Sequence, residues 1–333
     1  MAHSLFMGKL STVAGIFVLS AGVLPAFAQV EMQQAGSDHI AITVNGRPFS
    51  DFYFGANYPK PFLAPLRTAS GLVVTRKYPM ENVEGESRDH QHHRGLFIGH
   101  GEINGLNFWE NEFKYQSNAP KNFNAAKNGR MVLRKLNEVK SGKKSGKIEA
   151  AFDWAGPDGA LILEEKRTMT FYADPEDERI FDVDFTLTAK KTAQFADTKE
   201  GFFAIRIADS MTEKNGGLMT NSEGAETEKK VWGKPANWVD YDGTVEGQKV
   251  GIAIFDHPGN YNHPERWHSR AYGLFAVNPF GLKDFEPKTE AQGGYTIKTG
   301  DALRFRYRVI IYPGDMPKKK LDDLYSEYAK KGS

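Results

Sequence analysis

Hydrophobic and polar residues alternate along several stretches of this chain, as they do in strands that bury one face. In residues 181–187 the odd positions are apolar and the even positions are Asp or Thr. Residues 148–154 and 303–311 follow the same pattern, and arginines occupy the polar positions of the second stretch. Shorter β-rich runs lie between turn residues at 71–75, 168–172, 201–208, 250–255 and 272–277. The pattern predicts an all-β protein of antiparallel strands.

Helical periodicity occurs near the C-terminus. Leu321, Leu324, Tyr325 and Tyr328 follow Pro317 at positions i, i+3, i+4 and i+7, which predicts a short amphipathic helix packed on the body of the protein. The basic segment 137–147 contains Gly and Ser and is typical of an exposed hairpin tip. Since the chain has no internal repeat, low-complexity tract or long linker, residues 29–333 are expected to form one domain of two stacked or curved sheets.

The N-terminus has the features of a secretory signal peptide. Lys9 precedes an apolar stretch that ends in Ala26-Phe27-Ala28, a small-x-small cleavage site. We therefore expect residues 1–28 to be removed and the mature protein to be periplasmic or secreted. A retained membrane anchor is the alternative, although polar residues and glycines interrupt the apolar run, and no later segment is expected to cross a bilayer.

Charge and cysteine content exclude several classes of function. The chain has 43 Lys and Arg against 42 Asp and Glu, so loss of a leader containing Lys9 would leave the two signs balanced. A basic excess, which nucleic acid or an anionic membrane would require, is missing. The chain has no Cys, so disulfides and thiolate ligands are excluded, and a metal site would have to use His, Asp or Glu.

Histidines gather in two places. His90, His92, His93 and His100 lie within eleven residues, among glycines, and a second group comprises His257, His263 and His268. Histidine changes charge near neutral pH, so such clusters are typical of proton-transfer or metal-binding sites. We take His90, His92, His93, His268 and Asp256 as catalytic candidates. In a strand His92 and His93 would face opposite ways, so both can serve one site only if their segment is a loop.

Arginines, aromatic residues and polar groups near these histidines supply candidates for substrate binding. Guanidinium groups can clamp a carboxylate or a polarised sugar oxygen, but for Arg67 and Arg76 an inter-strand ion pair is an equal alternative. Trp109 and Trp267 could act as ring platforms, and Glu110 and Asp256 could orient a histidine or act as base. The substrate-binding candidates are Arg67, Arg94, His100, Asn107, Trp109, Glu110, Arg206, His257, Trp267, Arg270 and Asn278.

A metal site would draw on the same histidines. His90 and His92 on one strand face, completed by a distant Glu or by His268, could hold zinc or a similar ion. The chain contains no established motif such as His-Glu-x-x-His. No cofactor is therefore expected, while a divalent metal stays an open alternative.

Longer stretches of the chain resemble a known family. They are PFLAPLR (61–67), GLVVTR (71–76), DHQHHRGL (89–96), GHG (99–101), NFW (107–109) and WHSRAYGLFAVNPFG (267–281). Together they resemble the secreted PmoA-like family, a domain of unknown function, over nearly all of the mature chain. Family members more often have Pro where this chain has Gln91, a difference expected to change the rigidity of the loop more than its chemistry.

The resemblance implies a fold and a functional context. The family name refers to a methane monooxygenase subunit, a membrane protein whose several transmembrane helices this chain lacks after its leader. The resemblance implies instead a β-supersandwich similar to galactose mutarotase-like proteins, and bacterial neighbourhoods rich in sugar oxidoreductases and sugar-isomerase-like proteins. A shared fold alone does not establish a function.

Three functions stay open at this point. The leading hypothesis is an enzyme that acts on a small-molecule carbohydrate, a sugar or keto-sugar derivative, by proton transfer in epimerisation, elimination or hydrolysis. In this hypothesis His92 or His93 and His268 supply acid and base, and Arg94 and Arg270 stabilise developing negative charge. The alternatives are a non-catalytic carbohydrate-binding protein and a metal-dependent oxygenase or hydrolase. The oligomeric state is left open.

Overall fold

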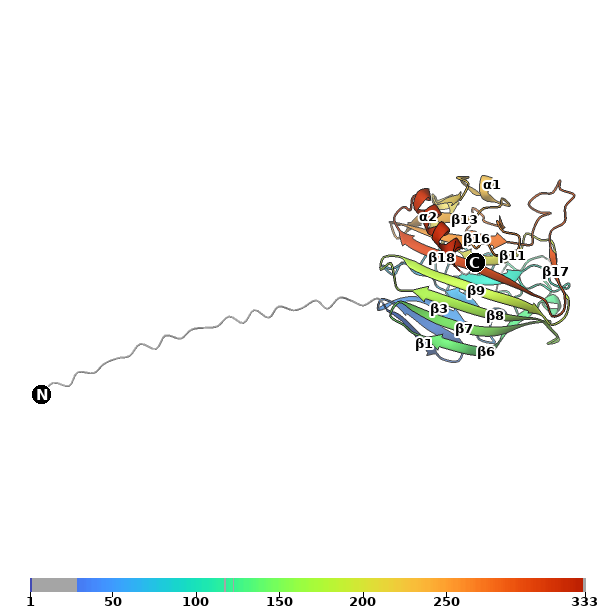
Figure 1. Cartoon of the computed structure of the whole chain (residues 1–333), viewed down its shortest axis with the longest axis horizontal. Helices are drawn as coiled ribbons and strands as arrows, with labels where there is room; N and C mark the ends of the chain where they lie inside the picture. Colours follow the sequence, from blue (N-terminus) through green and yellow to red (C-terminus); the bar gives the residue numbers. More distant parts are fainter. Residues whose placement is uncertain (2–28, 117, 122, 332–333) are drawn as a thin grey trace.

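Two large antiparallel sheets make up most of the protein (Figure 1). The structure is a computed structural model that describes residues 1, 29–116, 118–121 and 123–331. Apart from Met1, the predicted signal peptide lies outside the described residues. The first sheet has eight strands in the order β1 (Val30–Ala35), β2 (His39–Val44), β3 (Arg47–Tyr53), β4 (Phe62–Ala64), β5 (Leu96–His100), β11 (Gly201–Arg206), β16 (Leu274–Asn278) and β15 (Arg266–Trp267).

The second sheet also has eight strands. Their order is β12 (Leu218–Asn221), β13 (Trp238–Val245), β14 (Gln248–Asp256), β18 (Ala302–Pro313), β9 (Arg179–Ala189), β8 (Leu161–Tyr172), β7 (Ser145–Ala155) and β6 (Arg130–Lys140). β10 (Ala193–Phe195) and β17 (Tyr295–Ile297) form a separate antiparallel pair. The predicted fold class, an all-β antiparallel supersandwich with a short C-terminal helix, is confirmed.

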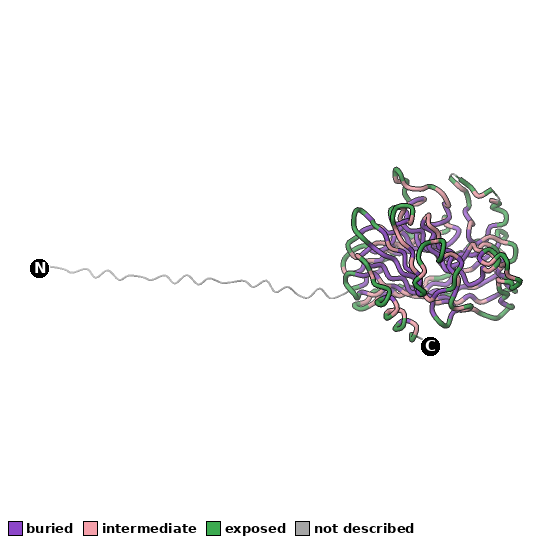
Figure 2. The backbone as a smooth tube through the Cα atoms, turned by 90° about the horizontal axis from the view of Figure 1, so that it is seen from above, coloured by how far each residue is buried: buried purple, intermediate pink, exposed green. Residues whose placement is uncertain are grey.

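The main core fills the space between the two large sheets. Burial alternates along the whole of β9, as its sequence predicts, and Phe185 of β9 packs on Phe305 of β18 with ring centroids 5.5 Å apart. Across the sandwich Phe203 of β11 stacks on Tyr307 of β18 at 4.5 Å. Figure 2 shows the buried segments in the middle of the molecule and the exposed ones in the peripheral loops. Burial of this apolar surface is the main force that holds the sheets together.

The helices are few and short. α2 (Lys318–Ala329) confirms the predicted C-terminal helix, and its Leu321 and Tyr328 pack against Phe255 and Ile310 on the outer side of the second sheet. The other helical segments are α1 (Glu228–Val231), η1 (Ala125–Lys127), η2 (Asp209–Met211) and η3 (Glu213–Asn215). In the described ranges, no helix has the length and hydropathy needed to span a membrane.

The predicted strand at 71–75 is wrong. This segment is a loop that makes only single bridges, from Val73 to Arg67 and from Thr75 to Ile207. It begins at Gly71, whose φ of 99° is not a strand conformation. The predicted hairpin tip at 137–147 is shorter than expected, because β6 continues to Lys140 and β7 begins at Ser145.

Candidate active site

The histidine-rich segment is a loop that folds over the outer face of the first sheet. Along β5, Leu96 and Ile98 enter the main core, whereas Phe97 joins a smaller cluster on the opposite face. Small residues, Ala204 and Ala276, belong to that cluster and leave room above the sheet. The loop enters β5 through Gly95, where φ is 47° and a Cβ atom would collide with the carbonyl of Leu63. Because residues 89–94 are not a strand, the opposite-face restriction on His92 and His93 does not apply.

Four rings form a stack that positions His90. Tyr272 lies parallel to His90 with centroids 5.1 Å apart, and His90 lies parallel to His93 at 4.9 Å. His93 in turn stacks on Phe97 at 5.5 Å. The ring of His92 meets His93 edge-on at 4.3 Å. The ring stack of Tyr272, His90, His93 and Phe97 therefore joins the loop to β5 and to the segment before β16.

Asp89 holds one nitrogen of His90. Asp89 Oδ2 lies 2.9 Å from His90 Nδ1, and the two side chains are 41% and 39% exposed. Two buried arginines fix the carboxylate, since Arg76 Nη1 donates to Asp89 Oδ1 at 2.6 Å and Arg206 Nη2 donates to the same oxygen at 2.8 Å. Although burial alone would raise the pKa of Asp89, the hydrogen bond from His90 and the charges of Arg206 and Arg76 hold it well below its usual range.

The second nitrogen of His90 is available for chemistry. Among the described residues, no side chain or carbonyl makes a recorded hydrogen bond to His90 Nε2. An Nδ1–H directed at this carboxylate would leave the lone pair of the ring on Nε2. Arg76 also donates to the carbonyl of His90 at 2.8 Å, which fixes the main chain beneath the ring. This arrangement suits a general base.

His92 and His93 lie beneath His90. Each is 1% exposed. Burial lowers the pKa of both rings well below the usual value, helped by the charge of Lys60 at His92 and of His92 at His93, so both are neutral near pH 7. Tyr115 Oη lies 3.0 Å from His92 Nδ1, while His92 Nε2 and both nitrogens of His93 lack a hydrogen-bond partner among the described residues. His93 is a member of the ring stack, and His92 packs edge-on against it.

Lys60 lies under the same cluster. Its ammonium is buried and donates to the carbonyl of Trp109 and to Asn111 Oδ1, 2.7 Å away. Burial lowers the pKa of Lys60 to about 7. Lys60 Nζ lies 5.1 Å from the centroid of Phe97, the last ring of the stack.

A second group of side chains lies on the other side of Tyr272. Trp232 Nε1 donates to His268 Nδ1 at 3.0 Å, and Arg270 Nε donates to Glu228 Oε1 at 2.6 Å. Burial lowers the pKa of His268 to about 3, with further contributions from the charges of Arg270, Lys199 and His90, so His268 is neutral. The guanidinium of Arg270 lies over Tyr272 at 5.6 Å and over Trp232 at 5.8 Å. The structure thus brings His90, His268 and Arg270 into one region.

Glu110 is a second ionisable group within electrostatic reach of His90. Burial and the nearby charge of Glu200 raise the pKa of Glu110, while the charges of His90 and Lys60 lower it. Glu110 and Asn107 line a polar cavity of about 240 Å³. Asn107 itself is held by its own turn, because its Oδ1 accepts hydrogen bonds from the main-chain nitrogens of Trp109 and Glu110. Glu110 is therefore available as an acid, not as the carboxylate that orients His90.

Neither predicted ring platform presents a face to a ligand. Trp109 and Trp267 are both 0% exposed. Trp267 lies in the main core on Phe275, and its Nε1 donates to the carbonyl of Ala236 at 2.9 Å. Trp109 packs under His93 at 5.6 Å. The structure does not support the platform role for either residue, because both rings are buried against other aromatic side chains.

Asp256 and His257 belong to a different cluster, beside α2. Asp256 is 0% exposed, and its Oδ2 accepts from His263 Nδ1 at 2.8 Å and from the main-chain nitrogen of Glu265. His257 Nε2 lies 2.9 Å from the carbonyl of Lys331. No recorded contact joins Asp256 or His257 to the ring stack within the described residues. The expectation that Asp256 partners a catalytic histidine at the site of His90 is therefore not supported.

The remaining predicted residues make structural contacts. Arg94 is paired with the buried carboxylate of Glu112 through its two terminal guanidinium nitrogens, Nη1 and Nη2. Asn278 donates to the carbonyls of Thr198 and Lys199. His100 is buried between Phe195 and Phe280, with its Nε2 2.9 Å from the carbonyl of Ala196, and burial lowers its pKa to about 4. Arg67 Nη1 donates to the carbonyl of Phe49 at 3.5 Å, and its charge acts on the nearby Asp51.

The metal site left open as an alternative is not formed by the described residues. In the part of the chain that the structure describes, no group of at least three His, Asp or Glu side chains is arranged to hold a metal ion. His90 faces Asp89, His92 faces Tyr115, and His268 accepts from Trp232, so the three rings that were considered as ligands do not converge.

Several residues of the site were not identified from the sequence. Asp89 adjoins the histidine cluster, and its position next to His90 is the signal that could have found it. Tyr272 lies within the long family-like stretch 267–281 but was not assigned a role there. Lys60, Tyr115, Glu228 and Trp232 carry no local signal, because their contacts depend on segments that only the fold brings together.

Comparison with solved structures gives distant similarities. A glycoside hydrolase family 97 enzyme from Pseudoalteromonas sp. strain K8, in complex with panose, is 10% identical with a TM-score of 0.32, and the match covers 86% of this chain and 34% of that one. A galactose mutarotase related enzyme from Lactobacillus acidophilus is 8% identical with a TM-score of 0.35, over 86% and 97% of the two chains. A GalM/aldose epimerase homologue from C. elegans is 10% identical with a TM-score of 0.30, over 87% and 100%.

These similarities say nothing about activity, because every TM-score is below 0.5. The chain spans about a third of the length of the glycoside hydrolase. No curated protein matches this sequence. The PmoA-like name expected from the motifs is not shown by any match and stays a prediction. The sequence does match the Family of unknown function (DUF6807) over residues 39–326, which is most of its length, and the chain therefore belongs to that family.

Proposed function

We propose that this protein is a secreted or periplasmic enzyme that acts on a sugar or keto-sugar, with His90 as the general base. The observation that carries the proposal is the contact of 2.9 Å between Asp89 Oδ2 and His90 Nδ1, on a ring that is otherwise partly exposed. A histidine oriented by a carboxylate and open at its other nitrogen can accept a proton from a bound substrate. The two buried arginines keep Asp89 charged, and that charge stabilises the imidazolium formed after proton transfer.

The proposed step moves one proton. His90 Nε2 takes it from a sugar hydroxyl, or from a carbon made acidic by a neighbouring keto group, and the electron pair stays on the substrate. Arg270 lies in the same region and can stabilise the resulting oxyanion. Glu110, whose pKa is raised by burial and by Glu200, is the candidate to supply a proton in return. Return of the proton to the opposite face gives epimerisation, and loss of a protonated leaving group as the electron pair forms a double bond gives elimination. In hydrolysis His90 would instead take its proton from the water that attacks the substrate, and Glu110 would protonate the leaving group.

The side chains around His90 support a carbohydrate as the substrate. Trp232 and Tyr272 are partly exposed aromatic residues, and Arg270, Glu228 and Glu200 surround them with partly exposed charged groups. A sugar offers a weakly polar ring face together with many hydroxyls, which such a mixed surface can bind. Trp232 and Tyr272 take the place of the buried Trp109 and Trp267 as ring contacts in this proposal.

A panel of sugars tests the function. The mature protein would be incubated with mono- and disaccharides, their keto derivatives and uronates, and products would be followed by NMR. We expect turnover of a sugar or keto-sugar by the wild type. The His90→Ala variant should retain ligand binding and lose turnover, which distinguishes an enzyme from a binding protein of the same fold.

The chain offers a matched control for this experiment. His39 Nδ1 lies 2.8 Å from Asp38, and the His39 ring stacks on Tyr53 at 5.0 Å, so a similar Asp-His pair exists away from the ring stack. The His39→Ala variant should turn over substrate like the wild type. Equal turnover by the His90→Ala variant would overturn the proposed role of His90.

A further inference from the structure

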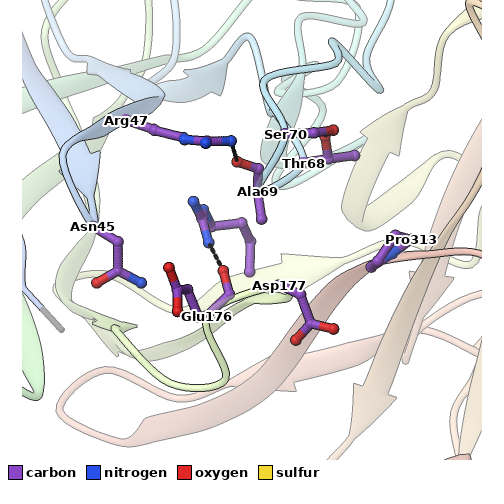
Figure 3. A pocket seen from close by; sticks show the side chains of 9 residues that line it. Asn45, Arg47, Thr68, Ala69, Ser70, Glu176, Asp177 and Pro313 are labelled. Atoms are coloured by element: carbon purple, nitrogen blue, oxygen red, sulfur yellow. Dashed lines mark hydrogen bonds between the residues drawn. The ribbon is translucent and has the colours of Figure 1, made fainter. Parts of the chain in front are cut away.

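A polar cavity of about 470 Å³ lies at an edge of the sandwich, and it shares no residue with the site around His90. It is lined by the turn between β2 and β3, by residues 68–70, by the turn between β8 and β9, and by Pro313 at the end of β18 (Figure 3). We propose that this cavity is a second binding site, for a polyhydroxylated carboxylate such as a sugar acid. The proposal is independent of the function assigned to His90.

Arg179 supplies a buried positive charge without a carboxylate partner. It is 2% exposed, and its Nη1 donates to the carbonyls of Glu176 at 3.1 Å and Glu178 at 2.9 Å. Its Nε has no hydrogen-bond partner, and no carboxylate in the described ranges lies within ion-pair distance of it. The neighbouring carboxylate of Glu178 is already paired with Lys320 at 2.8 Å. Buried charges in proteins are normally paired, so Arg179 is a candidate for binding an anion.

Arg47 brings a second guanidinium to the cavity. It is exposed at the start of β3, and its Nη1 donates to the carbonyl of Ala69 at 3.0 Å. Burial lowers the pKa of Arg179, the charge of Arg47 lowers it further, and the charge of Glu176 acts in the opposite direction. Both Arg47 and Glu176 therefore lie within electrostatic reach of Arg179. Arg47 also has no carboxylate within ion-pair distance among the described residues. Two such guanidinium groups favour a carboxylate, which a guanidinium can hold through two hydrogen bonds.

The remaining lining indicates what else the ligand carries. Figure 3 shows Arg47 and Ser70 on one side of the cavity and Glu176 and Asp177 on the other. Both carboxylates are exposed, and neither forms a recorded ion pair in the described part of the chain. They can accept hydrogen bonds from the hydroxyls of a ligand. The hydroxyls of Ser70 and Thr68, 2.9 Å apart, add further polar contacts.

The volume of the cavity also suits a sugar acid. Cavities that bind small organic molecules occupy about 300–1,000 Å³, so the space exceeds that needed by sulfate or phosphate and suits a sugar acid. A neutral sugar would leave both guanidinium groups without an anion. The combination of two cations with hydroxyl and carboxylate acceptors therefore points to one ligand that has both a carboxylate and hydroxyls.

Calorimetric titration of the mature protein tests this site. The probes are glucuronate, galacturonate and gluconate, with glucose as the neutral control and sulfate as the bare anion. We expect a sugar acid to bind more tightly than glucose and sulfate. The Arg47→Gln variant should weaken that binding at least about tenfold, since a charge-assisted bond is lost, and Arg47→Lys should restore part of it. Arg47 is exposed, so these changes should leave the fold intact.

Two further variants locate the binding. Arg134→Gln removes another partly exposed arginine, on β6, and should bind the probe like the wild type. His90→Ala should also leave this binding unchanged. The proposal is overturned if none of the three sugar acids binds at millimolar concentration, if sulfate binds as tightly, or if binding survives Arg47→Gln and is lost in His90→Ala.

Discussion

Asp89 and His90 are adjacent in sequence, yet Asp89 Oδ2 still reaches His90 Nδ1 at 2.9 Å. The backbone makes this contact feasible, because His90 has a φ of 41°, in the left-handed region that non-glycine residues rarely adopt. Arg76 spans the pair by donating to Asp89 Oδ1 and to the carbonyl of His90. Such local strain is often kept at functional sites, where surrounding contacts hold it in place.

Replacement of Asp89 by Asn should impair catalysis more than binding. The amide cannot supply the negative charge that orients His90 and stabilises its imidazolium, so kcat is expected to fall about 10²-fold or more, with little change in KM. Steady-state kinetics over a range of pH would measure both constants. Asp38→Asn, which alters the similar pair at His39, is the control and should leave kcat unchanged. A drop in Asp89→Asn that is confined to KM would argue for a binding role.

Tyr272 should contribute through its ring. It stacks on His90 at 5.1 Å and lies under the guanidinium of Arg206 at 4.8 Å. Tyr272→Phe keeps both ring contacts and should retain most of the activity, whereas Tyr272→Ala frees the His90 ring and should lower kcat about tenfold or more. If the two variants are equally impaired, the hydroxyl and not the stack is the important group. Circular dichroism would verify that both variants are folded.

The sequence predicts strands that bury one face better than strands that are buried on both faces or mostly exposed. The alternation along β9 is visible because each Phe, Val or Leu that faces the core is followed by Asp or Thr. Strands β11 and β16 are buried at every position, and apart from Gly201, Arg206 and Asn278 their residues are apolar, so their runs carry no such period. β6 is mostly exposed and was missed for the opposite reason. Residues 71–75 are β-rich, but their partners allow only single bridges.

Part of the site follows from the sequence and part requires the fold. The cluster of His90, His92 and His93 is local and was identified directly. Its partners Arg206 and Tyr272 come from distant segments, so no spacing rule could assign them. The sequence predicts a ligand-facing Trp267, but its ring enters the main core, and the next residue, His268, contacts Trp232 instead.

Asp240 should make stability depend on pH. Burial raises the pKa of Asp240 from 3.8 to about 8, while Tyr312 Oη donates to its Oδ2 at 2.7 Å and its Oδ1 lacks a partner within the described residues. The folded state therefore binds a proton that the unfolded state has lost, so the contribution is largest below pH 3.8 and declines up to about pH 8.

The Asp240→Asn variant provides the test. It keeps an acceptor for Tyr312 without an ionisable group, so at pH 8 it should be more stable than the wild type, by at most about 5 kcal/mol. Urea unfolding at pH 5 and pH 8 would measure the free energy of unfolding of both proteins. The same pH dependence in the two proteins would show that Asp240 is not responsible.

The predicted leader can be checked by expression with the native N-terminus in a bacterium. We expect the exported protein to begin at Gln29, next to β1, because the small-x-small site ends at Ala28. Intact-mass measurement of the periplasmic and membrane fractions would decide the point. A protein that retains residues 1–28 and stays with the membrane would support the anchor instead.

Transfer of solvent deuterium into a bound keto-sugar tests the role of His90 most directly. In deuterium oxide, a base at His90 should exchange the hydrogen on the carbon beside the keto group, and NMR would follow the loss of that signal. We expect exchange with the wild type and with His39→Ala, and a rate lower by about 10²-fold or more with His90→Ala. Exchange at the wild-type rate by the His90→Ala variant would contradict the assignment of His90 as the base.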